Sequence, residues 1–196
     1  MPADIPPPAS PLSTGTTANL AQTNGPGLQL DERCDIGMIL VRGKPDNSAF
    51  LETFKTLFGA MPPADQYIVH STPLTISRMG PIDFLISGPF DSVEALALKA
   101  EVASIGAPFH ATSISHGRVV IDMAGKNAKA LVSKSCGLDL REAAFPIGTG
   151  TRTRFAEIVG YIERIENNTF RLIADRSLAE YLSAWIAHIG ASGTAI

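Results

Sequence analysis

The charged residues best placed for chemistry lie between residues 139 and 154. Asp139 stands between Leu138 and Leu140, and such a carboxylate could act as a general base. Arg152 and Arg154 follow it and could bind an anion or an acidic group of a partner. An aspartate between two elements more commonly accepts backbone N–H bonds, and charge networks are often structural. We therefore expect Asp139, Arg152 and Arg154 to make partner-docking or anion contacts, and we predict no catalytic residue.

Two glycine-containing segments could suggest phosphate binding, and both fail on their spacing. Between Gly37 and Gly43-Lys44 there are five apolar or basic residues instead of four, and Pro45 replaces the magnesium-binding hydroxyl. Gly148-Thr-Gly150 lacks the third glycine of a dinucleotide fingerprint. We therefore predict that this chain alone binds no cofactor.

The histidines and cysteines do not form a metal-binding pattern. His110 and His116 would share one face of a strand, but about 20 Å apart at ~3.3 Å per residue. Cys34 and Cys136 have no Cys or His at ligand spacing. We predict no metal site, and we expect both cysteines to be reduced structural thiols.

Composition predicts a globular protein without affinity for nucleic acid or membranes. The 196 residues are 45% hydrophobic and 18% charged, with a net charge of −3. This charge offers no attraction to nucleic acid or to an anionic membrane. The sequence has neither a signal peptide nor an apolar run approaching ~18 residues, so we expect a cytoplasmic protein.

The chain divides by composition into an arm and a domain. Six of the first thirty residues are proline, and Asp4 is the only charged residue among them. Such a segment is extended unless something holds it, so we expect a Pro-rich arm over residues 1–33 that lies along another subunit. Residues 34–196 are expected to form one α+β domain.

Residues 36–123 predict a ferredoxin-like β-α-β-β-α-β unit. Asp46, Asn47 and Ser48 offer N-cap oxygens for the first helix, which Gly59 ends. Asp91 and Glu94 form a capping-box pattern for the second helix. The expected strands cover residues 36–41, 67–78 interrupted by Pro73, 82–86, 110–116 and 118–123. The second helix is expected to run over Val93, Leu96, Ala97, Ala100 and Ile105 and to end at Gly106.

An α-β-β-α unit is expected to follow. It consists of a helix over 126–135, an irregular segment over 138–151, strands over 155–165 and 170–174, and a final helix. Asn167-Asn168 is a plausible tight turn between the strands, and Ser177 with Glu180 is a second capping box. The final helix has one apolar face, formed by Leu178, Leu182, Trp185, Ile186 and Ile189.

The C-terminal half resembles the gamma subunit of heterotetrameric sarcosine oxidase. The resemblance covers residues 113–190 and rests on Gly125, Cys136, Leu138-Asp139-Leu140, Phe145, Gly148, Thr153-Arg154, Phe170, Arg176-Ser177, Tyr181-Leu182 and Trp185. Residues 36–112 agree in their order of elements more than in their letters. Where the family usually has Trp-Leu-Leu before Gly-Pro, this chain has the segment 83–89, Asp-Phe-Leu-Ile-Ser-Gly-Pro.

The resemblance implies an aminomethyltransferase-like fold and an accessory role without catalytic residues. The implied assembly contains alpha, beta and delta subunits and oxidatively demethylates sarcosine to glycine, formaldehyde or methylene-tetrahydrofolate, and hydrogen peroxide. FAD, FMN, NAD, tetrahydrofolate and zinc would be held by the other subunits. An accessory subunit should also expose a large apolar surface when isolated.

Three other functions stay open. One is the equivalent subunit of a related complex, such as an N-methylglutamate dehydrogenase. A second is a small folate-dependent one-carbon transferase that uses Asp139 as a base beside Arg152 and Arg154. A third is a ferredoxin-like ligand-sensing module, which should form a homodimer.

Overall fold

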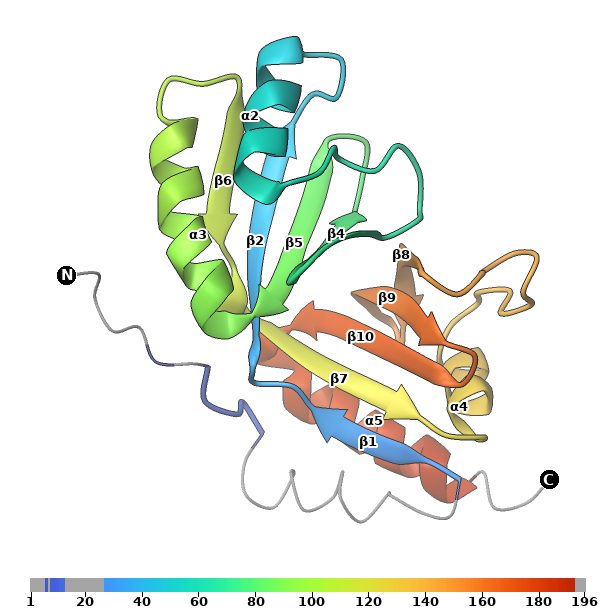
Figure 1. The fold of residues 1–196 in the computed structure, drawn as a ribbon. Helices are drawn as coiled ribbons and strands as arrows, with labels where there is room; N and C mark the ends of the chain where they lie inside the picture. Colours follow the sequence, from blue (N-terminus) through green and yellow to red (C-terminus); the bar gives the residue numbers. More distant parts are fainter. Residues whose placement is uncertain (1–5, 7, 13–26, 193–196) are drawn as a thin grey trace. The chain divides into compact units, whose positions relative to one another are not determined.

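The computed structural model describes residue 6, residues 8–12 and residues 27–192. These residues form two compact units (Figure 1). The first contains residues 35–116, and the second contains residues 27–34 and 117–192 together with residues 9–12. Each unit has its own sheet and its own hydrophobic core. The division into an arm over 1–33 and one domain over 34–196 stays a prediction.

The first unit has the predicted ferredoxin-like order of elements, with one extra strand. Its sheet is fully antiparallel, in the order β3-β4-β5-β2-β6. Along the chain the elements are β2 (Ile36–Gly43), α2 (Ser48–Phe58), β3 (Val69–Ser71), β4 (Leu74–Arg78), β5 (Asp83–Pro89), α3 (Phe90–Ser104) and β6 (Phe109–Ser113). The predicted last strand, over 118–123, does not belong here, because those residues pair in the other sheet.

A cluster of phenylalanines fills the core of the first unit. Phe50, Phe54 and Phe58 recur at helical spacing on α2, and all three are buried. Phe54 meets Phe84 of β5 with ring centroids 5.7 Å apart in an edge-on arrangement, which aromatic pairs favour. The aromatic stripe read from the sequence is therefore the core face of α2.

Both glycines of the rejected phosphate loop lie inside β2. A Cβ at Gly43 would lie 2.6 Å from the ring of Phe50, and a Cβ at Gly37 would lie 2.8 Å from the Cβ of Val93. The glycines are required because α2 and α3 pack closely against this strand. An extended strand cannot wrap around a phosphate group, so the segment is not a phosphate-binding loop.

The caps of α2 confirm the sequence reading. The Asn47 side chain accepts a 3.0 Å hydrogen bond from the Phe50 N–H. Gly59 has a φ of 77° and donates its N–H to the Lys55 carbonyl oxygen, so this glycine ends the helix in the left-handed conformation that glycine adopts without strain.

The two predicted capping boxes are wrong. Helix α3 begins at Phe90 directly after Pro89, without a side-chain cap, and Glu94 is buried. Glu94 instead accepts hydrogen bonds from the hydroxyls of Ser113 and Ser115, at 2.8 and 2.6 Å. The capping-box pattern was misleading because the hydroxyls of Ser113 and Ser115 bind the Glu94 carboxylate inside the protein.

At the second predicted capping box, Asp175 caps a 3-10 turn that precedes the final helix, and Ser177 donates hydrogen bonds instead of accepting them. The Asp175 carboxylate accepts from the Ser177 N–H at 3.0 Å and from its hydroxyl at 2.7 Å. A 3-10 turn over Arg176–Leu178 then precedes α5 (Ala179–Ser192). The pKa of the Asp175 carboxyl is lowered, first by the Ser177 hydroxyl and then by its N–H, because both hydrogen bonds favour the ionised form.

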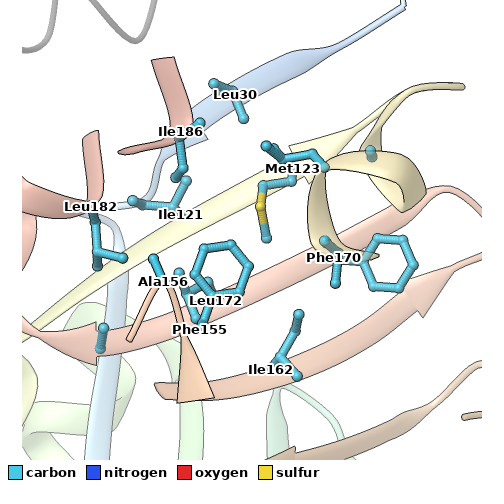
Figure 2. Close-up of a cluster of buried hydrophobic side chains, with 14 of the residues drawn as sticks. Leu30, Ile121, Met123, Phe155, Ala156, Ile162, Phe170, Leu172, Leu182 and Ile186 are labelled. Carbon is cyan, nitrogen blue, oxygen red and sulfur yellow. The ribbon is translucent and has the colours of Figure 1, made fainter. Parts of the chain in front are cut away.

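The second unit is a five-stranded antiparallel sheet with α4 and α5 contributing to its core. The strand order is β1-β7-β10-β9-β8. The elements are β1 (Gln29–Glu32), β7 (Arg118–Ala124), α4 (Ala128–Ser135), β8 (Thr149–Phe155), β9 (Ile158–Glu166), β10 (Thr169–Asp175) and α5. Figure 2 shows Leu182 and Ile186 of α5 meeting Ile121 and Leu172 in this core. The predicted Asn167-Asn168 turn joins β9 to β10.

Part of the predicted arm belongs to this unit. Residues 29–32 form β1, which pairs with β7. Leu12 is buried in the same core, and the Ser10 hydroxyl donates to Glu32 at 2.6 Å. These residues contact their own chain, and the expected contact of the arm with another subunit stays a prediction. The rest of the expectation falls on residues 1–5, 7 and 13–26, which lie outside the described residues.

Candidate functional site

The predicted site residues lie on the second unit, on and beside the β8–β9 hairpin. The sequence analysis placed residues 138–151 in an irregular segment and the next strand over 155–165, so it found β9 and missed β8. Arg152 and Arg154 lie on this strand, and both side chains are exposed. β8 is the last strand of the sheet and pairs along its length with β9. The two arginines therefore stand at a sheet edge.

Asp139 and Arg154 each form an ion pair with a residue close in sequence. The ion pairs join Asp139 to Arg141 and Arg154 to Glu157, and neither pair links Asp139 to the β8 arginines. The Arg141 guanidinium reaches both oxygens of Asp139, with Nε 2.9 Å from each. Because both oxygens of Asp139 accept hydrogen bonds from Arg141, this carboxylate is poorly placed to act as the general base of a folate-dependent transferase.

The electrostatics of Asp139 follow from that pairing. The pKa of its carboxyl is lowered from 3.8 to about 2, chiefly by the side-chain hydrogen bonds from Arg141 and next by the Arg141 N–H. The same contact raises the pKa of Arg141. Both groups are exposed, so solvent screens the pair and its contribution to stability is small. Asp139 is ionised at neutral pH and caps the start of the loop through the 3.0 Å bond from Arg141 N–H.

The turn between β8 and β9 has a strained backbone. Ala156 and Glu157 have φ values of 51° and 66°, in the left-handed region. Two-residue hairpin turns need this conformation, and normally use Asn or Gly for it. For other residues the left-handed conformation costs roughly 1–2 kcal/mol each. No glycine or asparagine marks this turn, which is why the sequence reading missed it.

Hydrogen bonds from two helices hold the strained turn in place. The Tyr181 hydroxyl of α5 donates to the Ala156 carbonyl oxygen at 2.7 Å, and the Ala156 N–H donates to the Ser135 carbonyl oxygen of α4 at 2.8 Å. Trp185 Nε1 in turn donates to the Ser135 hydroxyl at 3.3 Å. Strained, well-supported turns gather at functional sites, so this turn is a candidate for presenting Glu157 to a partner.

Residues typical of protein interfaces surround the turn. Tyr181 is 42% exposed and Val159 is 59% exposed. The Tyr181 and Trp185 rings lie 6.4 Å apart on successive turns of α5. Trp185 was predicted to be a core residue and is only partly buried, packed against the core from its edge. Tyrosine, tryptophan and arginine are enriched at protein–protein hot spots.

The sequence reading also missed Arg164, which anchors the segment 137–148. This β9 arginine has a side chain that is only 1% exposed. Its Nη1 lies 2.7 Å from the Phe145 carbonyl oxygen and 2.9 Å from a Glu142 oxygen, and its backbone carbonyl accepts from the Gly148 N–H at 2.8 Å. No alternation in the sequence marks this arginine, because residues 160–164 are buried on both faces of β9.

The described residues offer no obvious place for a metal. No three His, Cys, Asp or Glu side chains gather to hold a metal ion in this part of the chain. Cys136 is a free thiol whose Sγ contacts the Val132 carbonyl oxygen at 3.2 Å, and its burial raises its pKa. Cys34 is also free. Over residues 27–192, no helix is long and apolar enough to cross a membrane.

Comparison with known proteins agrees with the architecture of both units. A solved structure of heterotetrameric sarcosine oxidase from Corynebacterium sp. U-96, in complex with pyrrole 2-carboxylate, contains a chain with a TM-score of 0.85 and 21% identity, over 96% of this chain and 97% of that one. The glycine cleavage system aminomethyltransferase T from Bartonella henselae has a TM-score of 0.59 at 15% identity, over 87% of this chain and 48% of that one. The aminomethyltransferase-like α+β fold is thus confirmed.

Sequence comparison assigns the family. Sarcosine oxidase subunit gamma from Corynebacterium sp. (strain P-1) is 25% identical over 181 residues, which is 91% of this chain and 84% of that protein. The model of the family described as sarcosine oxidase, gamma subunit, matches residues 42–192. This match covers most of both units and confirms the resemblance read from residues 113–190. The chain belongs to the sarcosine oxidase gamma subunit family.

Proposed function

We propose that this chain is the accessory gamma subunit of a heterotetrameric enzyme that oxidatively demethylates sarcosine to glycine. The match of residues 42–192 to the gamma subunit family carries the proposal. The similar solved chain comes from a heterotetrameric sarcosine oxidase, which supports assembly with three other kinds of subunit. Those partners are alpha, beta and delta subunits, in the cytoplasm. The one-carbon product is formaldehyde or methylene-tetrahydrofolate, and the reduced product is hydrogen peroxide.

The cofactors of the proposed reaction belong to the other subunits. FAD, FMN, NAD and tetrahydrofolate would supply the redox and one-carbon chemistry there, and zinc would be bound by delta. The residues of this chain fit none of these groups well: the glycine segment over 37–43 is the interior of a strand, and the described His, Cys, Asp and Glu side chains do not gather in threes. Residues of this chain would position partners instead of reacting with substrate.

We further propose that the β8 edge and the neighbouring turn form a docking surface, defined by Arg152, Arg154, Glu157, Val159 and Tyr181. The two arginines favour an acidic segment of a larger subunit, and Val159 with Tyr181 offers apolar area at the centre. Asp139 lies in the segment that precedes β8, and its pairing with Arg141 orders the start of that segment. Its role here is to position the loop beside the docking surface.

The backbone supports docking at this edge. Residues 155 and 158 flank a two-residue turn and form a hydrogen-bonded pair, so the backbone groups of Arg152 and Arg154 point away from β9. Among the described residues, the neighbour on that side is a single bridge from Cys136 to Phe155. An extended segment of a partner could pair there, as partners do at exposed sheet edges.

Two alternatives are kept for defined reasons. The equivalent subunit of an N-methylglutamate dehydrogenase would have the same fold and the same docking surface, because substrate choice would lie in the flavin-bearing subunit. A folate-dependent one-carbon transferase is favoured only by the similarity of fold to aminomethyltransferase T, of which this chain spans about half the length. Saturable binding of tetrahydrofolate to the purified chain would favour that transferase.

The test combines assembly with turnover. The tagged chain is co-expressed with the other subunits, and the purified material is assayed for sarcosine-dependent hydrogen peroxide. Arg152→Glu combined with Arg154→Glu should reduce the fraction of chain recovered in the complex, with a loss that depends on salt. Lys126→Glu is the matched control, because Lys126 is an exposed cation on the same unit. If the double arginine variant and Lys126→Glu both assemble as well as the wild-type chain, the proposed docking surface is contradicted.

A further inference from the structure

The outer face of α3 carries an apolar stripe in the first unit. Leu98 is 44% exposed and Val102 is 69% exposed, and Ala95 lies on the same face. Ile105, the C-cap residue directly after the last turn of α3, is 81% exposed and continues the spacing of these residues. We call Ala95, Leu98, Val102 and Ile105 the α3 stripe. The sequence analysis ran the helix through Ile105, and the structure ends it one residue earlier, with Ile105 as the C-cap. The core face is formed by Phe90, Val93, Ala97 and Ala100.

A helix that is apolar on opposite faces is normally packed on both. One face of α3 is covered by its own sheet, with Val93, Ala97 and Ala100 in the core of the unit. The opposite face should therefore be covered in the assembled protein. Three large apolar side chains on one exposed helix face are more than the scattered single residues that a monomer tolerates.

The spacing of the apolar residues in the stripe indicates that its partner is a helix. Positions 95, 98, 102 and 105 alternate steps of three and four residues, the repeat that keeps a seam facing a second helix. In that repeat, Ala95 and Val102 take the a positions, and Leu98 and Ile105 take the d positions. The seam is about 15 Å long at ~1.5 Å per residue. Asp91 stands at the preceding d position and limits the apolar seam at its N-terminal end.

The charges beside the stripe argue against a second copy of this chain. Lys99 is exposed on one flank, and Glu101 lies on the other. In an antiparallel pair of α3 helices, each Lys99 would face the other Lys99. In a parallel pair, Lys99 would face Glu94, which is buried and already bound to Ser113 and Ser115. Neither arrangement of two copies gives Lys99 an acidic partner.

We propose that the α3 stripe binds an amphipathic helix of another subunit, with apolar residues at the same spacing and an acidic residue beside Lys99. This inference rests on the proposed assembly into a heterotetramer. It adds a second contact, on a different unit from the β8 edge. The apolar seam supplies the affinity, and Lys99 fixes the register of the partner helix.

The first test measures incorporation. Val102→Glu is placed in the full chain and co-expressed with the other subunits, and native mass spectrometry gives the fraction of chain in the complex. A charge at the centre of a seam should lower incorporation by about tenfold or more. Ser92→Glu is the matched control, since it adds the same charge to the same helix outside the stripe. Leu98→Lys is a second variant, in case Val102→Glu prevents folding.

The second test identifies the occupant. A photo-crosslinking amino acid at position 102 is activated in the assembled wild-type background, and the linked peptide is mapped. The proposal expects a helical segment of another subunit with apolar residues three and four apart. A link to a second copy of this chain, a link to a non-helical segment, or full incorporation of Val102→Glu and Leu98→Lys overturns it. If the wild-type chain itself fails to assemble, the proposed function fails along with this inference.

Discussion

Arg164 Nη1 donates a 2.7 Å hydrogen bond to the carbonyl oxygen of Phe145, so a buried arginine on β9 holds the irregular segment that leads into β8. The same guanidinium pairs with Glu142 and donates from Nη2 to the Asn167 side chain at 3.0 Å. One side chain thus ties the irregular segment, at Glu142 and Phe145, to the turn between β9 and β10. The candidate docking surface therefore depends on a residue that does not itself reach the surface.

Arg164→Ala should lower the free energy of unfolding by roughly 2–4 kcal/mol. The change leaves the Phe145 carbonyl without its donor and opens a cavity in a packed region. Urea unfolding of the full chain measures the effect. Arg152→Ala is the control, because an exposed arginine should change stability by no more than about 0.5 kcal/mol. Equal, small losses for both would contradict the anchoring role of Arg164.

Glu157→Gly should stabilise the chain by about 0.5–1 kcal/mol relative to Glu157→Ala. Both variants lose the exposed ion pair to Arg154, which is worth little, and only glycine relieves the left-handed backbone with its φ of 66°. Thermal unfolding of the two variants side by side gives the difference. If the alanine variant is the more stable, the turn is not strained as described. Assembly of the glycine variant would further show whether the fixed position of Glu157 matters to docking.

The carboxyl of Asp139 should titrate near pH 2 in the folded chain. Its pKa is lowered from 3.8 to about 2 by Arg141. Because the folded pKa is depressed, any stability from the pair is present above the unfolded pKa and is lost as pH falls from about 4 towards 2. Carbon-13 NMR of the labelled carboxyl group follows the titration. In Arg141→Ala the midpoint should rise towards 3.8, and an unchanged midpoint would mean that Arg141 is not the cause.

Trp185→Ala should cost about 3 kcal/mol, at the low end of the usual range for tryptophan, because Trp185 is only partly buried. Ser135→Ala removes the hydrogen-bond acceptor of Trp185 Nε1 and should cost about 1 kcal/mol. Circular dichroism is the suitable probe, since Trp185 is the sole tryptophan and its fluorescence disappears with the substitution. A loss in Trp185→Ala no larger than that in Ser135→Ala would show that the indole ring does not pack against the core.

Sequence patterns predicted the elements whose signals are local. The aromatic spacing of α2, its Asn47 cap and the Asn167-Asn168 turn depend on neighbours within a few residues, and all three were confirmed. Strand β8 was missed because Thr149–Phe155 alternates threonine and arginine, without the apolar alternation of a half-buried strand.

The remaining errors involve partners that are distant in the sequence. Glu94 looked like a capping residue and is instead bound by hydroxyls 19 and 21 residues later. Residues 118–124 follow β6 closely, yet they pair with β10 and β1 in the other sheet. Ile105 is a residue type that is usually buried. Nothing in the neighbouring sequence shows that its side chain is exposed to solvent at the end of α3. Contacts of this kind become visible only when the fold brings the segments together.

The most direct test of the account is native mass spectrometry on the tagged chain purified from its own cells. We predict that it emerges bound to larger, flavin-containing chains, with one copy per heterotetramer, and that the complex oxidises sarcosine. A chain that emerges alone or as a homodimer would contradict the accessory role, whatever its similarity to sarcosine oxidase gamma subunits.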